Sequence, residues 1–149
     1  MNAKNLQKKT AASPRPFLKW AGGKRALMDD IMARLPDGQI ELYIEPFLGG
    51  GAVFLELARQ GRVNRAILND RNPELVHTYK MVRDKPAELI DAIYQWTPDE
   101  DTYYAVRALD GLDLSDVDRA ARVIWLNRLC FNGLYRINRS GQFNVPYGK

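Results

Sequence analysis

The sequence predicts an α/β fold that begins with a parallel sheet and continues into helices and a C-terminal β-hairpin. Two short apolar strands, each followed by a turn and a helix, lie in the first half of the chain. The second half shows helical periodicity without strands between its helices, and it ends in two half-apolar runs around a glycine-containing loop. Strands that alternate with helices are typical of parallel sheets, because a crossover helix connects one strand to the next.

The first predicted elements are separated by clear turn signals. Apolar residues at helical spacing predict a helix over about 25–35, and the Pro-Asp-Gly turn at 36–38 ends it. A strand over 42–45 leads into the loop 46–51, which contains three consecutive glycines. The apolar run 52–58 then predicts a helix. A strand that enters a glycine loop and then a helix is typical of a nucleotide-binding unit.

The next unit repeats this order. Gly61 closes the preceding helix, and residues 65–69 form the second predicted strand. Asn72 before Pro73 predicts a helix start, because the Asn side chain can cap free N–H groups and proline suits the first turn. Helical spacing continues to about Val82. The two units together indicate the first part of a cofactor-binding α/β domain.

The second half of the chain predicts a helical region with a hairpin. Helical segments lie near 86–95, 99–109 and 117–130. Two half-apolar runs between 134 and 147 flank an Asn-Arg-Ser-Gly loop, which is a hairpin signal. No internal repeat or low-complexity segment interrupts this order.

The domain organisation follows from these elements. Residues 1–13 are polar, lysine-rich and without periodicity, which predicts a flexible tail. The α/β part covers 14–85, and the helical part with its hairpin covers 86–149. Two strands are too few for a finished α/β sheet. We therefore expect the rest of that domain to lie outside this chain.

Composition excludes several classes of protein. The 149 residues are 27% charged and 46% hydrophobic, which is a normal globular balance. No apolar run approaches the about 18 residues of a membrane span, and no secretory signal is present. The single cysteine, Cys130, and the single histidine disfavour disulfides and zinc sites and fit a reducing cytoplasm. We expect a cytoplasmic protein with no membrane or metal partner, and its oligomeric state stays open.

The net charge of +4 conceals two basic ends around an acidic centre. Seven basic residues and no acidic residue precede Asp29, and six basic residues and no acidic residue follow Asp118. All 18 acidic residues lie between these ends. This asymmetry suggests a polyanionic partner, with solvated basic segments as the alternative.

The glycine loop and the acidic residue after the second strand form a candidate ligand site. Gly49, Gly50 and Gly51 allow a ligand to approach backbone N–H groups at the start of a helix. Asp70 stands where a carboxylate accepts hydrogen bonds from ribose hydroxyls. A tight structural turn and a surface aspartate are the alternative.

Two well-known phosphate-binding loops do not match. Phe54 stands where the dinucleotide fingerprint requires its last glycine. The segment Gly22-Gly23-Lys24 is not a P-loop, because Leu18 and Arg25 replace its first glycine and its Ser or Thr. A ligand with a ribose but without a polyphosphate fits both observations.

Four motifs follow one another along the chain. Residues 17–24 read Phe-Leu-Lys-Trp-Ala-Gly-Gly-Lys, and residues 45–51 read Glu-Pro-Phe-Leu-Gly-Gly-Gly. Asn69-Asp70-Arg71-Asn72 is the third motif, and the segment from Leu126 to Pro146 contains the fourth. In this order they resemble the motifs of the Dam-type DNA adenine-N6 methyltransferases, the D12 class. The resemblance runs from about residue 16 to the end of the chain.

The resemblance implies S-adenosylmethionine as the cofactor, bound on a partial Rossmann-like methyltransferase sheet. It assigns Lys24 to the methionine carboxylate and Asp70 to the ribose. The cofactor-binding residues that it implies are Trp20, Lys24, Phe47, Gly49, Gly51 and Asp70. Without the motif, Trp20 would be interpreted as a core aromatic residue and Lys24 as a solvated lysine.

The resemblance also implies duplex DNA as the partner, a target-recognition role for 86–149, and site-specific methylation of adenine N6, with GATC as the suggested site. Leu134 matches a position that wedges into the base stack, and Arg136 could bind a guanine as a fork. Phe131 replaces the tyrosine often found at its position, which keeps stacking but loses a hydroxyl. The DNA-binding residues implied are Lys19, Phe131, Asn132, Leu134, Arg136 and Pro146.

The family's catalytic Asp-Pro-Pro-Tyr motif is absent from the sequence. The nearest tetrapeptide, at 144–147, lies in the hairpin and has valine in place of the first proline. We therefore assign no catalytic residue, and we expect the N-terminal portion of an enzyme that is inactive alone. The alternatives are a non-catalytic module that binds DNA or cofactor, and a methyltransferase that acts on RNA or a small molecule.

Overall fold

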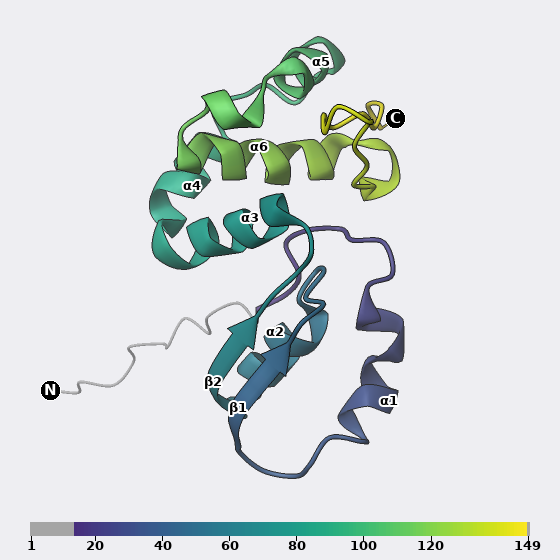
Figure 1. Ribbon diagram of the computed structural model, residues 1–149, viewed down its shortest axis with the longest axis vertical. Coiled ribbons are helices and arrows are strands. Elements are labelled where there is room, and N and C mark those ends of the chain that lie inside the picture. Colours follow the sequence, from purple (N-terminus) through teal and green to yellow (C-terminus); the bar gives the residue numbers. More distant parts are fainter. Residues whose placement is uncertain (1–13, 149) are drawn as a thin grey trace, which may run out of the picture.

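The computed structural model describes residues 14–148, so the predicted tail at 1–13 lies outside the described residues. This part of the chain has the predicted α/β character, with a small parallel sheet and six α-helices. Strand β1 (Ile40–Glu45) pairs in parallel with β2 (Val63–Leu68), and α2 (Ala52–Arg59) crosses from one to the other (Figure 1). Each strand begins two residues earlier than predicted.

Only one face of the sheet is well covered. Helix α2 buries Val53 and Leu57. Leu42, Ile44 and Ile67 keep 42%, 58% and 55% of their surface exposed. Within residues 14–148 no further strand pairs with β1 or β2. Parallel sheets are usually buried on both faces, so this sheet is open to further packing.

The predicted helix at 25–35 is present but shorter. It consists of a 3-10 turn, Lys24–Leu27, and α1 (Met28–Met32). After Met32 the chain tightens into turns, because the N–H of Leu35 bonds to the carbonyl of Met32 three residues back. Neither segment contains a buried residue, and Leu27 is 57% exposed. The apolar periodicity therefore predicted a helix, but the apolar side chains of this helix are not buried in a core.

The other helices form one group above the sheet (Figure 1). They are α3 (Pro73–Asp84), α4 (Pro86–Ile93), α5 (Glu100–Ala108) and α6 (Asp116–Leu129). Helix α6 is central: residues 120–127 are all buried, and α3, α4 and α5 pack against it. The predicted start of α3 is confirmed, because the Asn72 side chain accepts hydrogen bonds from the N–H groups of Glu74 and Leu75.

The apolar core lies around α6 in two clusters. One cluster joins α6 to α5 and to the C-terminal segment through Tyr103, Trp125 and Phe143. The other joins α6 to the N-terminal segment, α3 and α4, and it contains Leu18 and Leu75. The proposed division between 14–85 and 86–149 stays a prediction, and this second cluster packs the two parts together.

The C-terminal segment forms a reduced version of the predicted hairpin. Ile137 and Phe143 make one isolated antiparallel bridge, and the Asn144 N–H donates to the Arg136 carbonyl at 3.0 Å. No strand extends from this bridge within the described part of the chain. The physical reason is that Phe143 and Val145 are buried against the helices, so the segment packs on α6 more than on itself.

Candidate functional site

The glycine loop has a backbone conformation that favours glycine. Gly49 and Gly51 have φ angles of +54° and +67°, in the left-handed region where other L-residues are strained. The Gly49 N–H donates to Asp70 Oδ2 at 2.9 Å, and the Gly51 N–H donates to the Leu48 carbonyl at 2.9 Å. Asp70 thus ties the loop after β1 to the end of β2.

A hollow of about 290 Å³ lies beside this loop, and we call it the glycine-loop hollow. Five of the six predicted cofactor residues line it, namely Trp20, Lys24, Phe47, Gly49 and Asp70. The structure therefore brings together residues that are up to 50 positions apart in the sequence. Gly51 does not line the hollow, and a Cβ built on it would point toward Tyr79 of α3.

Lys24 is held at the rim of the glycine-loop hollow. Its Nζ donates to the Phe47 carbonyl at 2.7 Å and lies 3.0 Å from Oε1 of the buried Glu45. The Tyr43 hydroxyl donates to the other oxygen of Glu45 at 3.0 Å, and burial together with this carboxylate raises the pKa of Tyr43. An ammonium group has three donors, so Lys24 keeps one for a ligand.

Asp70 uses each carboxylate oxygen once. Oδ2 accepts from Gly49, and Oδ1 accepts from the Asn72 N–H at 2.9 Å. A carboxylate oxygen has two lone pairs, so both oxygens can accept a further hydrogen bond from a ligand hydroxyl. The backbone bonds fix the carboxylate at the wall of the glycine-loop hollow.

Sequence reasoning missed Tyr79 of α3. Its hydroxyl is buried and has no hydrogen-bond partner within residues 14–148, and burial raises its pKa, as do the charges of Glu45 and Asp70. A side chain at Gly51 would collide with this hydroxyl. The Tyr79 ring also packs against Phe17, at 4.9 Å between ring centroids. The contact with Tyr79 thus explains why residue 51 is a glycine. The position of Tyr79 in the sequence alone did not indicate this contact.

Asn127 is a second residue to which sequence reasoning gave no role. This buried side chain bonds to both backbone groups of Lys19, and its Nδ2 also donates to the Gly133 carbonyl at 3.0 Å. The Lys19 side chain occupies the space where a Cβ of Gly133 would lie. An asparagine that follows the apolar run 123–126 is a sequence signal for a buried polar contact, but it does not identify Lys19 as the partner.

The predicted DNA-binding residues gather near the end of α6. Lys19, Asn132 and Leu134 line a groove of about 550 Å³ that also contains Arg128, and we call it the recognition groove. An adjoining hollow of about 530 Å³ is lined by Lys19, Arg128, Phe131 and Asn132. The N-terminal and C-terminal basic segments therefore meet at Lys19 and Arg128.

Arg136 and Pro146 lie outside these two hollows. The exposed Arg136 donates from Nε to Asn144 Oδ1 at 2.7 Å and from Nη2 to the Asn144 carbonyl at 3.2 Å, which orients the guanidinium. Its other N–H groups have no partner in the described part of the chain. The Pro146 carbonyl accepts from the Phe131 N–H at 2.9 Å. Tyr147 packs against Tyr103, at 5.3 Å between ring centroids.

The glycine-loop hollow and the recognition groove adjoin. Trp20, Ala21, Gly23, Gly50 and Ala52 line both. Predicted cofactor residues and predicted DNA residues therefore lie on two sides of a shared wall.

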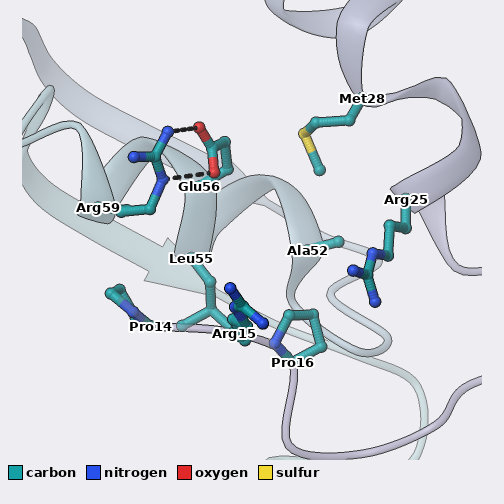
Figure 2. A pocket seen from close by; sticks show the side chains of 9 residues that line it. All are labelled: Pro14, Arg15, Pro16, Arg25, Met28, Ala52, Leu55, Glu56 and Arg59. Atoms are coloured by element: carbon teal, nitrogen blue, oxygen red, sulfur yellow. Dashed lines mark hydrogen bonds and ion pairs between the residues drawn. The ribbon is translucent and has the colours of Figure 1, made fainter. Parts of the chain in front are cut away.

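Another hollow, of about 450 Å³, lies beside α2 and is shown in Figure 2. Arg15, Arg25 and Arg59 line it, and Arg59 is paired with Glu56. Hydrogen bonds from Arg59 lower the pKa of Glu56 to about 2. This hollow is lined by none of the predicted cofactor or DNA residues.

Two further observations concern other classes of site. Among residues 14–148, no group of three or more His, Cys, Asp or Glu side chains is arranged to hold a metal ion. No helix in the same range has the length and apolar character of a membrane span.

Comparison with known proteins identifies several relatives. A type II methyltransferase of Lactococcus lactis, M1.LlaDCHI, is 42% identical over 97% of this chain and 51% of its own length. The DNA adenine methylase of Escherichia coli is 40% identical over 91% of this chain and 48% of its own length. A DNA N-6-adenine-methyltransferase of Escherichia phage P1 is 42% identical over 95% of this chain and 19% of its own length. The chain thus spans about half the length of the first two relatives.

The sequence profile of the D12 class of N6 adenine-specific DNA methyltransferases matches residues 20–149. This match includes the glycine loop, Asp70 and the recognition segment at 126–146. It agrees with the resemblance of the four motifs. The chain belongs to the D12 class of N6 adenine-specific DNA methyltransferases.

Proposed function

We propose that the protein transfers a methyl group from S-adenosylmethionine to N6 of adenine at specific sites in duplex DNA. Membership of the D12 class and the names of the relatives support the reaction. The observation that carries the proposal is the shared wall between the glycine-loop hollow and the recognition groove, with Trp20 in both. A cofactor on one side and an extruded adenine on the other would be within reach of each other.

The residues of the glycine-loop hollow fit this cofactor. S-adenosylmethionine, when bound, supplies an electrophilic methyl group on its sulfonium. The free donor of Lys24 can bind the methionine carboxylate, and the remaining lone pairs of Asp70 can accept from the ribose hydroxyls. The fit needs no pyrophosphate cradle, which agrees with the failure of the dinucleotide pattern at Phe54.

The recognition groove supports DNA as the substrate. Lys19 and Arg128 supply positive charge for phosphates, and the half-exposed Phe131 can stack on a base. Leu134 is 38% exposed, which lets it enter the base stack as a wedge. Arg136 has free guanidinium N–H groups for a guanine.

We further propose that the groups that bind the target amine come from sequence other than residues 1–149. The printed sequence contains no Asp-Pro-Pro-Tyr motif, and the relatives from L. lactis and E. coli are about twice as long as this chain. Purified 1–149 should transfer no labelled methyl group to DNA. Measurable incorporation into adenine would overturn this part of the proposal.

Methylation-sensitive digestion tests the function in cells. The complete gene is expressed in a host that lacks adenine methylation, and its DNA is treated with enzymes that cut only unmethylated GATC or only methylated GATC. Protection of GATC supports both the reaction and the suggested site. Unmodified adenine throughout the DNA would favour the non-catalytic binding module.

A second candidate is a methyltransferase that acts on RNA or a small molecule. Binding of labelled S-adenosylmethionine, measured with and without duplex DNA, separates it from the first. A DNA methyltransferase forms a ternary complex with the duplex. An enzyme for another substrate binds the cofactor but leaves the duplex free.

A further inference from the structure

A stack of two aromatic rings connects the recognition segment to the glycine-loop hollow. The ring centroids of Tyr135 and Trp20 are 5.0 Å apart with an interplanar angle of 30°. Tyr135 lies between Leu134 and Arg136, which are both exposed, whereas Tyr135 is half-buried. Leu134 has an extended backbone, so neighbouring side chains point to opposite sides. Residues proposed to contact DNA thus flank a residue that stacks on Trp20, which lines the glycine-loop hollow.

Trp20 continues the connection to the glycine loop. Its Cδ1 would lie 3.2 Å from a Cβ at Gly49, so the indole packs directly on the loop. The Gly49 N–H is in turn bonded to Asp70. Lys19, the neighbour of Trp20, lines the recognition groove but not the glycine-loop hollow. One aromatic pair therefore joins the segment that carries Lys19 to the segment that carries Leu134 and Arg136.

Tyr135 is held on its other sides as well. Its ring meets Phe143 at 5.7 Å between centroids in an edge-to-face arrangement. Burial raises the pKa of Tyr135, and the neighbouring Asn72 side chain partly counters this rise. Asn72 follows the Asp70 loop and caps α3. The ring therefore packs among Trp20 of the hollow, Asn72 at the start of α3 and Phe143 of the C-terminal segment.

We propose that Tyr135 is a positioning residue that couples cofactor binding to DNA binding through its stack on Trp20. This inference rests on the proposed function. A ligand in the glycine-loop hollow restricts Trp20, and the stack then restricts Tyr135 together with Leu134 and Arg136. The recognition segment is partly ordered before DNA arrives, so the duplex binds more tightly. Coupling is reciprocal, so the duplex tightens cofactor binding by the same factor.

The test is a thermodynamic cycle on the protein from the complete gene. S-adenosylhomocysteine serves as the probe because it carries no transferable methyl group. The Kd of a duplex that contains the target site is measured by fluorescence anisotropy with and without saturating S-adenosylhomocysteine. For the wild type we expect the ratio of the two Kd values to be about fivefold or more, the lower end of typical couplings.

Four variants locate the coupling. Tyr135→Ala should bring the ratio close to one while each separate Kd changes by less than about threefold, and Tyr135→Phe should restore the wild-type ratio because the stack needs only the ring. Tyr135→Leu fills the apolar site but cannot stack on Trp20, so it should also remove the coupling. This variant keeps the test valid if Tyr135→Ala does not fold. The matched control is Tyr94→Ala, whose side chain is 82% exposed, and it should keep the wild-type ratio.

The outcomes distinguish this inference from the proposed function. A wild-type ratio near one, or an unchanged ratio in Tyr135→Leu, overturns the coupling role although both ligands bind. Absence of binding of either S-adenosylhomocysteine or duplex to the wild type overturns the proposed function itself. Loss of coupling in the alanine and leucine variants, with retention in the phenylalanine variant, supports the stack as the coupling contact.

Discussion

Asn127 holds the backbone of Lys19 in place from 108 positions away. Its Oδ1 accepts from the Lys19 N–H at 2.8 Å, and its Nδ2 donates to the Lys19 carbonyl at 2.8 Å. The same Nδ2 donates to the Gly133 carbonyl. One buried side chain therefore fixes the N-terminal segment against the turn at 131–133, and both carry residues that we propose contact DNA.

Asn127→Ala should destabilise the protein and weaken DNA binding together. The substitution leaves three backbone groups without their partner in a buried site, which should lower the free energy of unfolding by about 3 kcal/mol. Urea denaturation measures this effect. Asn64→Ala, at an exposed asparagine of β2, is the control and should cost less than about 0.5 kcal/mol. A loss below about 1 kcal/mol for Asn127→Ala would contradict the role that we assign to it.

Gly51 and Gly61 form a matched pair for the glycine loop. Both have a φ of +67°, but a Cβ at Gly61 would meet no atom of residues 14–148 within 4 Å, whereas a Cβ at Gly51 would collide with the Tyr79 hydroxyl. Gly61→Ala should therefore cost only the backbone strain, about 1 kcal/mol. Gly51→Ala should cost at least about 1 kcal/mol more in thermal or urea unfolding.

Removal of the Tyr79 hydroxyl should relieve part of this cost. The next atom of Tyr79, Cζ, would lie 3.2 Å from the new Cβ, a tight contact that a shift of the ring by a few tenths of an ångström relieves, whereas the hydroxyl would lie much closer. The double variant Gly51→Ala with Tyr79→Phe should therefore be more stable than Gly51→Ala alone. Equal costs at Gly51 and Gly61, or no recovery in the double variant, would show that Tyr79 does not determine the glycine requirement.

Substitutions of Asp70 and Arg136 should affect cofactor binding and DNA binding separately. Asp70→Ala removes the proposed ribose acceptor and frees the Gly49 N–H, so the Kd for S-adenosylhomocysteine should rise by about tenfold or more while duplex affinity changes little. Arg136→Ala should weaken duplex binding by about tenfold, a typical cost for one base contact, and spare the cofactor. Calorimetry and fluorescence anisotropy measure the two affinities. Equal loss of both affinities in either variant would count against this division.

Alkaline pH should destabilise the fold through its buried tyrosines. Burial raises the pKa of Tyr79 and of Tyr103, whose hydroxyl also donates to the Val145 carbonyl at 2.9 Å. The folded protein therefore holds these protons more tightly than the unfolded chain does. The stability that they contribute is complete below pH 10 and falls as pH rises above it, by up to about 1.4 kcal/mol per pH unit for each tyrosine.

Unfolding measured between pH 9 and pH 11 tests this dependence. Tyr103→Phe should make the decline with pH shallower, because one of the shifted groups is gone. Tyr94→Phe, at a side chain that is 82% exposed, should leave the slope as it is in the wild type. An unchanged slope in Tyr103→Phe would contradict the role of its buried hydroxyl.

Local signals predicted most of the elements. Asn72 with Pro73 set the start of α3, and Gly61 follows the end of α2, because caps and turn residues act on their immediate neighbours. The glycine loop and Asp70 were predicted to form one site, and the Gly49 to Asp70 hydrogen bond joins them. These contacts follow from the topology of a parallel pair, in which both loops lie at the same edge.

Contacts between distant segments could not be predicted in the same way. Nothing near Asn127 in the sequence indicates that it bonds to Lys19, and the stack of Tyr135 on Trp20 depends on how the C-terminal segment packs on α6. The hairpin is reduced to one bridge for the same reason, since burial of Phe143 outweighs strand pairing. Tertiary packing determines these features. The pattern of a single sequence indicates only the interactions between residues that are close along the chain.

Mass spectrometry of nucleosides tests the central claim most directly. Duplex DNA is incubated with S-adenosylmethionine and the protein from the complete gene, digested to nucleosides and analysed for methylated bases, with Asp70→Ala as the control. The proposed function predicts N6-methyladenine from the wild type and strongly reduced N6-methyladenine from the variant. DNA in which adenine stays unmodified, or in which only cytosine is methylated, would contradict it.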